Sequence, residues 1–348
     1  MRSAIPLLAV LLVAVGSGVA EARVAFTSAK GITAKGARVF VANDDGTGIT
    51  ALGVRGSRPA ISPDGTRVAY VAGPIGEGTS LRIRTIATGA EVVSAAPFGG
   101  IGDPLWSPDG TRLLAPTDAV DADGYVTGEG LTLVDAATGA VTVVVPAKGN
   151  EVTGYSWAPS GAQFAYATKR WTGRLYGETI RIANADGTAA RTLGAGTNPL
   201  WGPTRIVFRR HTSERWHAMT VYHAQLWLAD PTTQLSHYPA KGMVAGPWAG
   251  YWAPDGSTLY GGIGGEDYAL PGRVNATTGR FTPYRDASGA TFSDAFPAGI
   301  SADGATLLMR VDVIAGREQV KLMPAAGGAM RSYIRDVLEI SLTPSWQP

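Results

Sequence analysis

Short apolar segments separated by turn residues recur along the chain from residue 23 to its end. Six times, an extended segment leads into Pro-Asp-Gly, or a degenerate form of it, and a mostly apolar run follows. The turn glycine supplies a positive φ, and short apolar runs bounded by turns are typical of buried strands. Each copy therefore predicts a β-hairpin. The copies are residues 57–70, 103–115, 154–166, 198–208, 250–260 and 296–309.

A second hairpin follows the first in each unit. Leu131–Val144 and Ile180–Leu193 show it most clearly, each with two apolar segments around a short turn. Two hairpins supply four strands, which is the size of one propeller blade. The sequence therefore predicts an all-β fold built from four-stranded blades.

The spacing of the copies predicts the number of blades. Successive turns are 44 to 51 residues apart, counted at Pro63, its equivalents and Ala302. A seventh copy, residues 342–348, has only a first strand, whereas residues 23–57 supply later strands without a first. We therefore expect a seven-bladed β-propeller, closed by the C-terminal strand joining the N-terminal blade, which leaves no open sheet edge. If the degenerate unit near Pro203 is not a blade, the count is six.

The Trp-Ser-Pro-Asp-Gly motif, intact at Trp106–Gly110, resembles the TolB-like, or WD40-like PD40, β-propeller repeat. The resemblance covers nearly all of residues 23–348 and is specific for the fold rather than for a function. It implies kinship with TolB, a periplasmic protein with a six-bladed propeller and an N-terminal α/β domain, which binds an outer-membrane lipoprotein. This chain differs because its repeats begin at residue 23 and count to seven, so that envelope role is not carried over.

The first 22 residues have the pattern of a secretory signal peptide. Arg2 precedes an apolar run from Ile5 to Val15, and the small residues Ala20 and Ala22 flank Glu21. The apolar run is shorter than the roughly 20 residues that a membrane span needs. We therefore expect cleavage after Ala22, export to the periplasm or the medium, and a mature propeller of residues 23–348.

Composition removes several classes of function. Lys+Arg 30 against Asp+Glu 28 gives a net charge of +2, which predicts no nucleic-acid partner. The absence of Cys excludes disulfides, Cys-liganded zinc, iron–sulfur clusters and a Cys nucleophile. The sequence has no nucleophile elbow, His-Glu-x-x-His or phosphate loop. We therefore assign no catalytic residue, resident metal or cofactor, although acid–base chemistry stays open.

A basic cluster with two tryptophans is the main candidate binding site. Trp106 and its repeat equivalents are expected to pack between blades, whereas Trp171 and Trp216 lie outside that register. Corresponding loops of successive blades lie side by side, so cations from two units meet on one face. Such a patch suits an acidic glycan or an acidic protein segment; the alternative is a solvated surface with local salt bridges. The candidate residues are Lys169, Arg170, Trp171, Arg174, Arg209, Arg210, Arg215 and Trp216.

Histidines and an acidic turn raise the question of a metal. His211, His217, His223 and His237 lie in one unit and its leading loop, where they are either metal ligands or ordinary loop residues. Some oligogalacturonate lyases are similar seven-bladed propellers that use His and Gln around a divalent metal, but no motif carries their residues over. Asp121 and Asp123 belong either to a calcium loop or to a polar turn.

These observations favour a monomeric, non-catalytic binding or scaffold module. Its expected partner is an envelope or extracellular protein, or an acidic glycan. The alternatives are a metal-dependent, lyase-type enzyme acting on acidic polysaccharide, and a purely structural assembly subunit.

Overall fold

The structure is a computed structural model, and the regular elements in the described part of the chain are all β-strands. The expected signal peptide, residues 1–22, lies outside the described residues. No helix in the described part of the chain is long and apolar enough to cross a membrane. The described residues are 23–33, 36–43, 46–73, 78–95, 100–147, 149–171, 176–216, 219–232, 236–237, 248–264, 269–286, 288–292, 295–301, 303–313, 317–333 and 345–346.

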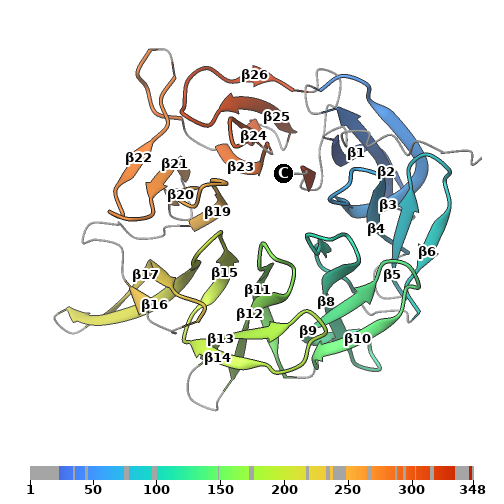
Figure 1. Cartoon of the computed structure of the whole chain (residues 1–348), viewed down its shortest axis with the longest axis horizontal. Coiled ribbons are helices and arrows are strands. Elements are labelled where there is room, and N and C mark those ends of the chain that lie inside the picture. Colours follow the sequence, from blue (N-terminus) through green and yellow to red (C-terminus); the bar gives the residue numbers. More distant parts are fainter. Residues whose placement is uncertain are drawn as a thin grey trace, which may run out of the picture.

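The strands form six antiparallel sheets arranged as a propeller around a central axis (Figure 1). The first sheet has seven strands in the order β27-β1-β2-β3-β4-β5-β6. Their bounds are β1 Arg23–Thr33, β2 Gly36–Asn43, β3 Thr50–Ile61, β4 Arg67–Ala72, β5 Ser80–Thr85, β6 Glu91–Val93 and β27 Ser345–Trp346.

The other five sheets have four strands each, in chain order from one edge to the other. The second sheet is β7 Leu105–Trp106, β8 Arg112–Val120, β9 Val126–Asp135 and β10 Val141–Val145; the third is β11 Glu151–Trp157, β12 Gln163–Trp171, β13 Tyr176–Asn184 and β14 Arg191–Gly194. The fourth is β15 Thr197–Trp201, β16 Ile206–Trp216, β17 Met219–Ala229 and β18 Ser236–His237; the fifth is β19 Trp248–Trp252, β20 Thr258–Gly264, β21 Ala269–Asn275 and β22 Phe281–Pro283. The sixth is β23 Ala295–Ile300, β24 Thr306–Val313, β25 Arg317–Pro324 and β26 Arg331–Ser332.

The antiparallel order divides the turns between the two faces of the ring. Strands β11, β15, β19 and β23 lie towards the centre, and β14, β22 and β26 towards the rim (Figure 1). The Pro-Asp-Gly turns and the outer hairpin turns therefore lie on one face, which we call the turn face. The β8–β9, β12–β13 and β16–β17 hairpins end on the opposite face, which we call the hairpin face.

The predicted closure by the C-terminal strand is confirmed. Strand β27 pairs with β1, with Trp346 opposite Val24 and Ser345 opposite Ala25. This pairing joins the last strand of the described chain to the first, and β27 lies near the centre of the ring (Figure 1).

The number of sheets differs from the predicted seven because β3 is shared. Its first half pairs with β2, through Thr50 to Gly56, and its second half pairs with β4, through Ser57 to Ile61. The two halves of this sheet nevertheless pack on one another, since Val41 and Leu52 lie in one buried cluster with Val68 and Tyr70. The degenerate unit near Pro203 does form a four-stranded sheet of its own.

Apolar clusters fill the spaces between neighbouring sheets. Ile182 and Ala165 pack on Phe208 and Ile206 of the next sheet, for example, and Leu228 packs on Leu259 of the one after it. Similar clusters join the remaining neighbours, including the sixth sheet to the first through Leu308, Leu322, Val24 and Phe26. The ring is therefore held by the aliphatic faces of its sheets.

The repeated motif fixes each turn and each contact with the preceding sheet. Ser62 Oγ donates to Asp64 Oδ1 at 2.5 Å and accepts from Arg67 N at 2.9 Å, which closes the Pro-Asp-Gly turn. The Trp157 indole donates to Leu105 O of the preceding sheet at 3.1 Å. Trp106 and Trp252 make the equivalent bonds to Ala60 and Leu200. The structural role predicted for these three tryptophans is confirmed.

Candidate functional site

The two halves of the predicted basic cluster lie on neighbouring sheets at the hairpin face. Lys169, Arg170 and Trp171 end β12, and Arg209 and Arg210 lie in β16. A hydrogen bond joins the two hairpins, because His211 Nδ1 lies 3.1 Å from Glu178 Oε2 and Glu178 is the cross-strand partner of Lys169. The structure thus places the two groups at one sheet boundary.

The cations of this cluster differ in their surroundings. Lys169 Nζ lies 3.5 Å from Glu151 Oε2, so part of its charge is compensated locally. The Arg210 guanidinium lies 4.6 Å from the Trp227 ring centroid, a cation–π contact. Arg209 Nε is buried and has no hydrogen-bond partner among the described residues. Arg170 is exposed, and no ion pair joins it to a described carboxylate.

The described side chains include only some of the predicted residues. Arg174 lies outside the described residues, and Arg215 and Trp216 are described only as backbone of β16. Trp171 is described, and 56% of it is exposed.

Exposed apolar side chains lie at the ends of two hairpins on neighbouring sheets. The β8–β9 hairpin presents Val120, Tyr125 and Val126 at its tip, exposed by 38%, 72% and 61%. With Trp171 they make up half of the eight large hydrophobic residues exposed in the described part of the chain. The hairpins are adjacent, because Glu151 lies beside both Lys169 of β12 and Glu129 of β9. We call Val120, Tyr125, Val126, Arg170 and Trp171 the hairpin-tip patch. The sequence predicted Arg170 and Trp171 as binding residues but not Val120, Tyr125 and Val126 of the β8–β9 hairpin.

The described residues provide no set of metal ligands for either the histidine site or the calcium loop. No group of three His, Asp or Glu side chains there is arranged to hold a metal. His211 pairs with Glu178, His217 lies outside the described residues, and His223 and His237 are described only as backbone. Asp121 Oδ1 accepts from the N–H groups of Asp123 and Tyr125, at 3.0 and 2.9 Å, so it closes its own turn.

A second polar group, which sequence reasoning missed, lies where the inner strands begin. Arg58 Nη1 lies 2.9 Å from Asp103 Oδ1, and the Tyr155 hydroxyl donates to the Asp103 carbonyl. These residues come from three successive sheets. The available signal was positional, because Arg58, Asp103 and Asn198 all stand immediately before the proline of an inner strand. Arg58 and Asn198 also share a left-handed backbone, with φ of 52° and 51°.

Glu129 is the most perturbed carboxyl of this region. Its partial burial, with the charges of Asp118 and Glu151 nearby, raises its pKa to about 7, and Arg58 offsets part of this rise. Burial, followed by the charge of Asp103, also raises the pKa of Tyr155, and that of Tyr251 to about 12. We call Arg58, Asp103, Glu129 and Tyr155 the inner cluster. It can bind a polar group, but it lacks the constellation of a nucleophile or metal enzyme.

Solved structures show what this chain is similar to. The tricorn protease matches with a TM-score of 0.62 and 13% identity, over 88% of this chain and 34% of its own. This chain therefore spans about a third of that protein. Oligogalacturonate lyase in complex with manganese matches with a TM-score of 0.58 and 18% identity, over 82% of each chain. TolB from Acinetobacter baumannii matches with a TM-score of 0.52 and 15% identity, over 91% of this chain and 80% of its own.

The fold is that of a TolB-like propeller. At these identities the likeness shows the fold alone, and the neighbours include TolB, a protease and a lyase. No protein-family model matches the sequence, and no curated protein matches it. The repeat resemblance is therefore supported by the structure neighbours, while the repeat family itself is not matched.

Proposed function

We propose that the chain is an exported binding module that recognises a protein partner through the hairpin-tip patch. The observation that carries this proposal is the exposure of Tyr125, Val126, Val120 and Trp171 at the ends of two adjacent hairpins, with Arg170 next to Trp171 in the chain. Aromatic residues and Arg are favoured anchors of protein interfaces, and a cluster of exposed apolar residues marks such sites more often than scattered ones do. The partner presents an apolar surface with an acidic segment facing Arg170.

The proposal includes cleavage after Ala22 and a mature ring of seven blades. Support for seven comes from β3, whose halves pair with β2 and β4, and from the buried cluster packed between those halves. With this sheet counted as two blades, each unit has four strands. The periplasm and the extracellular medium both fit such a protein.

Site-specific photo-crosslinking tests the proposal. A photoreactive residue replaces Tyr125 or Trp171, and a matched control replaces Val143, which is exposed by 61% on β10, away from the hairpin tips. We expect both patch positions, and not Val143, to crosslink the same envelope or secreted protein. The purified partner should then bind at least tenfold less tightly to Tyr125→Ser combined with Arg170→Glu.

Two results would count against this function. One is equal crosslinking from position 143, and the other is unchanged affinity after the patch substitutions. A third result would change the assigned ligand. If the chain binds an acidic glycan instead of a protein, and Arg170→Glu combined with Arg210→Ala abolishes that binding, the site is a glycan-binding site. Measuring the metal content of residues 23–348, purified without a histidine tag, tests the lyase-type alternative separately.

A further inference from the structure

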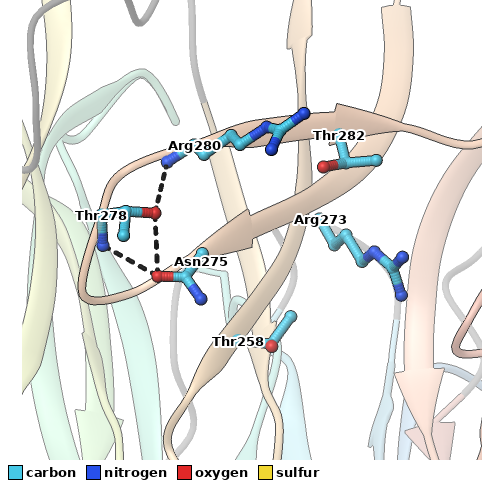
Figure 2. Close-up of a pocket in the computed structure, with 6 residues that line it drawn as sticks. All are labelled: Thr258, Arg273, Asn275, Thr278, Arg280 and Thr282. Atoms are coloured by element: carbon cyan, nitrogen blue, oxygen red, sulfur yellow. Dashed lines mark hydrogen bonds between the residues drawn. The ribbon is translucent and has the colours of Figure 1, made fainter.

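A cationic groove runs along the fifth sheet at the turn face, on the side facing the sixth sheet. Its first section, about 430 Å³, is lined by Thr258, Arg273, Asn275, Thr278, Arg280 and Thr282 (Figure 2). Its second section, about 420 Å³, shares Arg273, Arg280 and Thr282 with the first and extends past Phe281 to Gly327 and Gly328 of the sixth sheet. The shared residues make the two sections one continuous groove.

The sheet register explains why these side chains share one surface. Arg273 of β21 lies opposite Thr282 of β22 and Tyr260 of β20, and Thr258 lies opposite Asn275. Alternate residues of a strand point to the same face. Arg273 and Asn275, Thr258 and Tyr260, and Arg280 and Thr282 therefore all project from the face of the fifth sheet that packs on the sixth, where Tyr260 contacts Met309 and Met323 in one cluster.

The other repeats provide an internal comparison for Arg273. The position is defined by register: it is the third-strand residue opposite the second residue after Arg67 or its repeat equivalent, which is Arg205 in the fourth sheet and Thr258 in the fifth. Arg273 is opposite Tyr260, just as Leu133 is opposite Leu114 and Ile182 is opposite Ala165. In the other six units this position holds a buried aliphatic residue, exposed by no more than 4%, namely Val41, Ile83, Leu133, Ile182, Leu228 and Leu322.

An arginine at this position removes an apolar contact that every other unit makes. Burying a branched aliphatic side chain stabilises a protein, so its replacement by a charged group has a cost that folding alone does not explain. The space is also kept open from the other side, because the turn after β25 places Gly327 and Gly328 along the groove. A Cβ on Gly327 would lie 3.2 Å from the Tyr284 ring.

The groove presents donors rather than acceptors. No ion pair within the described residues joins Arg273 or Arg280 to a carboxylate. The Asn275 Oδ1 accepts from Thr278 N at 2.8 Å and from Thr278 Oγ1 at 3.0 Å, and Thr278 Oγ1 accepts from Arg280 N at 3.3 Å (Figure 2). In this network the Asn275 amide oxygen already accepts two hydrogen bonds, and the bond from Arg280 N holds the backbone at Arg280 in place.

We propose that this groove binds an acidic oligosaccharide through its carboxylate or sulfate groups. Guanidinium groups bind such oxyanions with paired, charge-assisted hydrogen bonds, and the Thr258 and Thr282 hydroxyls add further polar contacts. A groove of two connected sections suits an extended ligand better than a single ion. The site is separate from the hairpin-tip patch, which lies on the opposite face.

Calorimetric titration of the full mature chain tests the site with three named probes. These are an oligogalacturonate, a sulfated heparin oligosaccharide of the same length, and inorganic phosphate. Arg273→Leu restores the aliphatic residue of the other units, so we expect it to fold with unchanged or higher thermal stability. We expect this variant to bind the preferred oligosaccharide at least tenfold more weakly than the unmodified protein. Arg280→Gln should weaken binding in the same direction.

Two variants serve as matched controls. Arg38→Ala removes an exposed cation of β2 and should leave the affinity unchanged. Arg170→Glu should also leave it unchanged, so failure of this site and failure of the hairpin-tip patch are distinguished. Preference for the carboxylate or the sulfate probe identifies the anionic group and supports the proposal. Unaltered affinity in Arg273→Leu, no binding of either oligosaccharide at millimolar concentration, or equally tight binding of phosphate would overturn it.

Discussion

At the scale of single residues, the bonds that cross from one sheet to the next come from a small set of side chains. The indoles of Trp106, Trp157 and Trp252 each donate to a carbonyl of the preceding inner strand. These bonds are buried or partly buried, so an acceptor left without its donor there has a desolvation cost. The repeat retains tryptophan for this bond as well as for its size.

Replacing one such tryptophan tests its bond. Trp157→Phe retains an aromatic ring but leaves Leu105 O without the indole donor. We expect a loss of about 1–3 kcal/mol in the free energy of unfolding, measured by urea denaturation. Trp171→Phe is the control, because Trp171 is 56% exposed and lies outside the repeat register. Equal effects of the two substitutions would contradict the assignment.

Glu129 predicts how stability depends on pH. Burial, with Asp118 and Glu151 nearby, raises its pKa from 4.5 to about 7, so the folded chain holds this proton more tightly than the unfolded chain. The stabilising contribution of protonated Glu129 is complete below about pH 4.5 and is lost as the pH rises through 7. Glu129→Gln should therefore have a higher Tm than the unmodified protein at pH 8, and this advantage should vanish towards pH 4.5.

Glu91 provides a control of opposite sign. Burial opposes its ionisation, but hydrogen bonds from Tyr70 and Arg84 and the charges of Arg84 and Arg82 lower its pKa overall. Ionised Glu91 therefore stabilises the fold above its unfolded-state pKa, and this contribution is lost on acidification. Glu91→Gln should lower the Tm at pH 8. A higher Tm at pH 8 in both Glu129→Gln and Glu91→Gln would contradict the opposite pKa shifts assigned to the two carboxyls.

At the scale of elements, each Pro-Asp-Gly turn fits against the turn of the preceding unit. Gly304 has a φ of 69°, and a Cβ there would lie 2.7 Å from Pro254 Cδ. Gly289 has a φ of 85° with nothing within 4 Å of the added atom. Gly304→Ala should therefore lower the free energy of unfolding by more than Gly289→Ala does. Gly289→Ala has only the penalty of a left-handed backbone, roughly 1–2 kcal/mol. Thermal unfolding of both variants measures the difference, and equal losses would show that the contact between turns is unimportant.

The closing strand makes a prediction of its own. Removal of residues 341–348 deletes β27 and exposes the edge of β1 at Val24 and Ala25. An unpaired edge loses its hydrogen bonds and can pair with another chain. We expect a lower Tm and concentration-dependent association, measured by calorimetry and light scattering. Wild-type stability of the monomeric truncated chain would show that the pairing contributes little.

The sequence predicted the strands and hairpins well where the turn residues between them were easily recognised. The Pro-Asp-Gly turns, the alternating hairpins and the closure by residues 345–346 were all visible as spacing and residue type. The continuous β3 was not, because the first repeat copy begins at residue 57 and the strand Thr50–Ile61 runs through that boundary. Nor could sequence place Glu129 beside Glu151 or bring Arg58 to Asp103, since these pairs depend on how neighbouring sheets are rotated. Arg273 became informative only when the register aligned it with its six aliphatic equivalents.

At the scale of the whole molecule, stability is shared among apolar clusters of similar kind. Each cluster joins neighbouring sheets, or the two halves of the first, so the loss of one is transmitted round a closed ring. Leu133→Ala, at a 4% exposed position between the second and third sheets, should cost about 2–5 kcal/mol. Calorimetry should show one transition at a lower midpoint. A separate early transition would mean that the sheets unfold independently.

The pairing of β1 with β27 also sets the order of events during synthesis. Ala25 and Ser345 are cross-strand partners, yet 320 residues separate them in the chain. At about 5–20 residues per second, the second partner leaves the ribosome roughly 15 to 60 seconds after the first. Throughout that interval the nascent chain carries an unclosed strand edge, so the ring cannot close until residues 345 and 346 have left the ribosome. A chain translocated unfolded would avoid this hazard, because all its strands would be available together when folding begins.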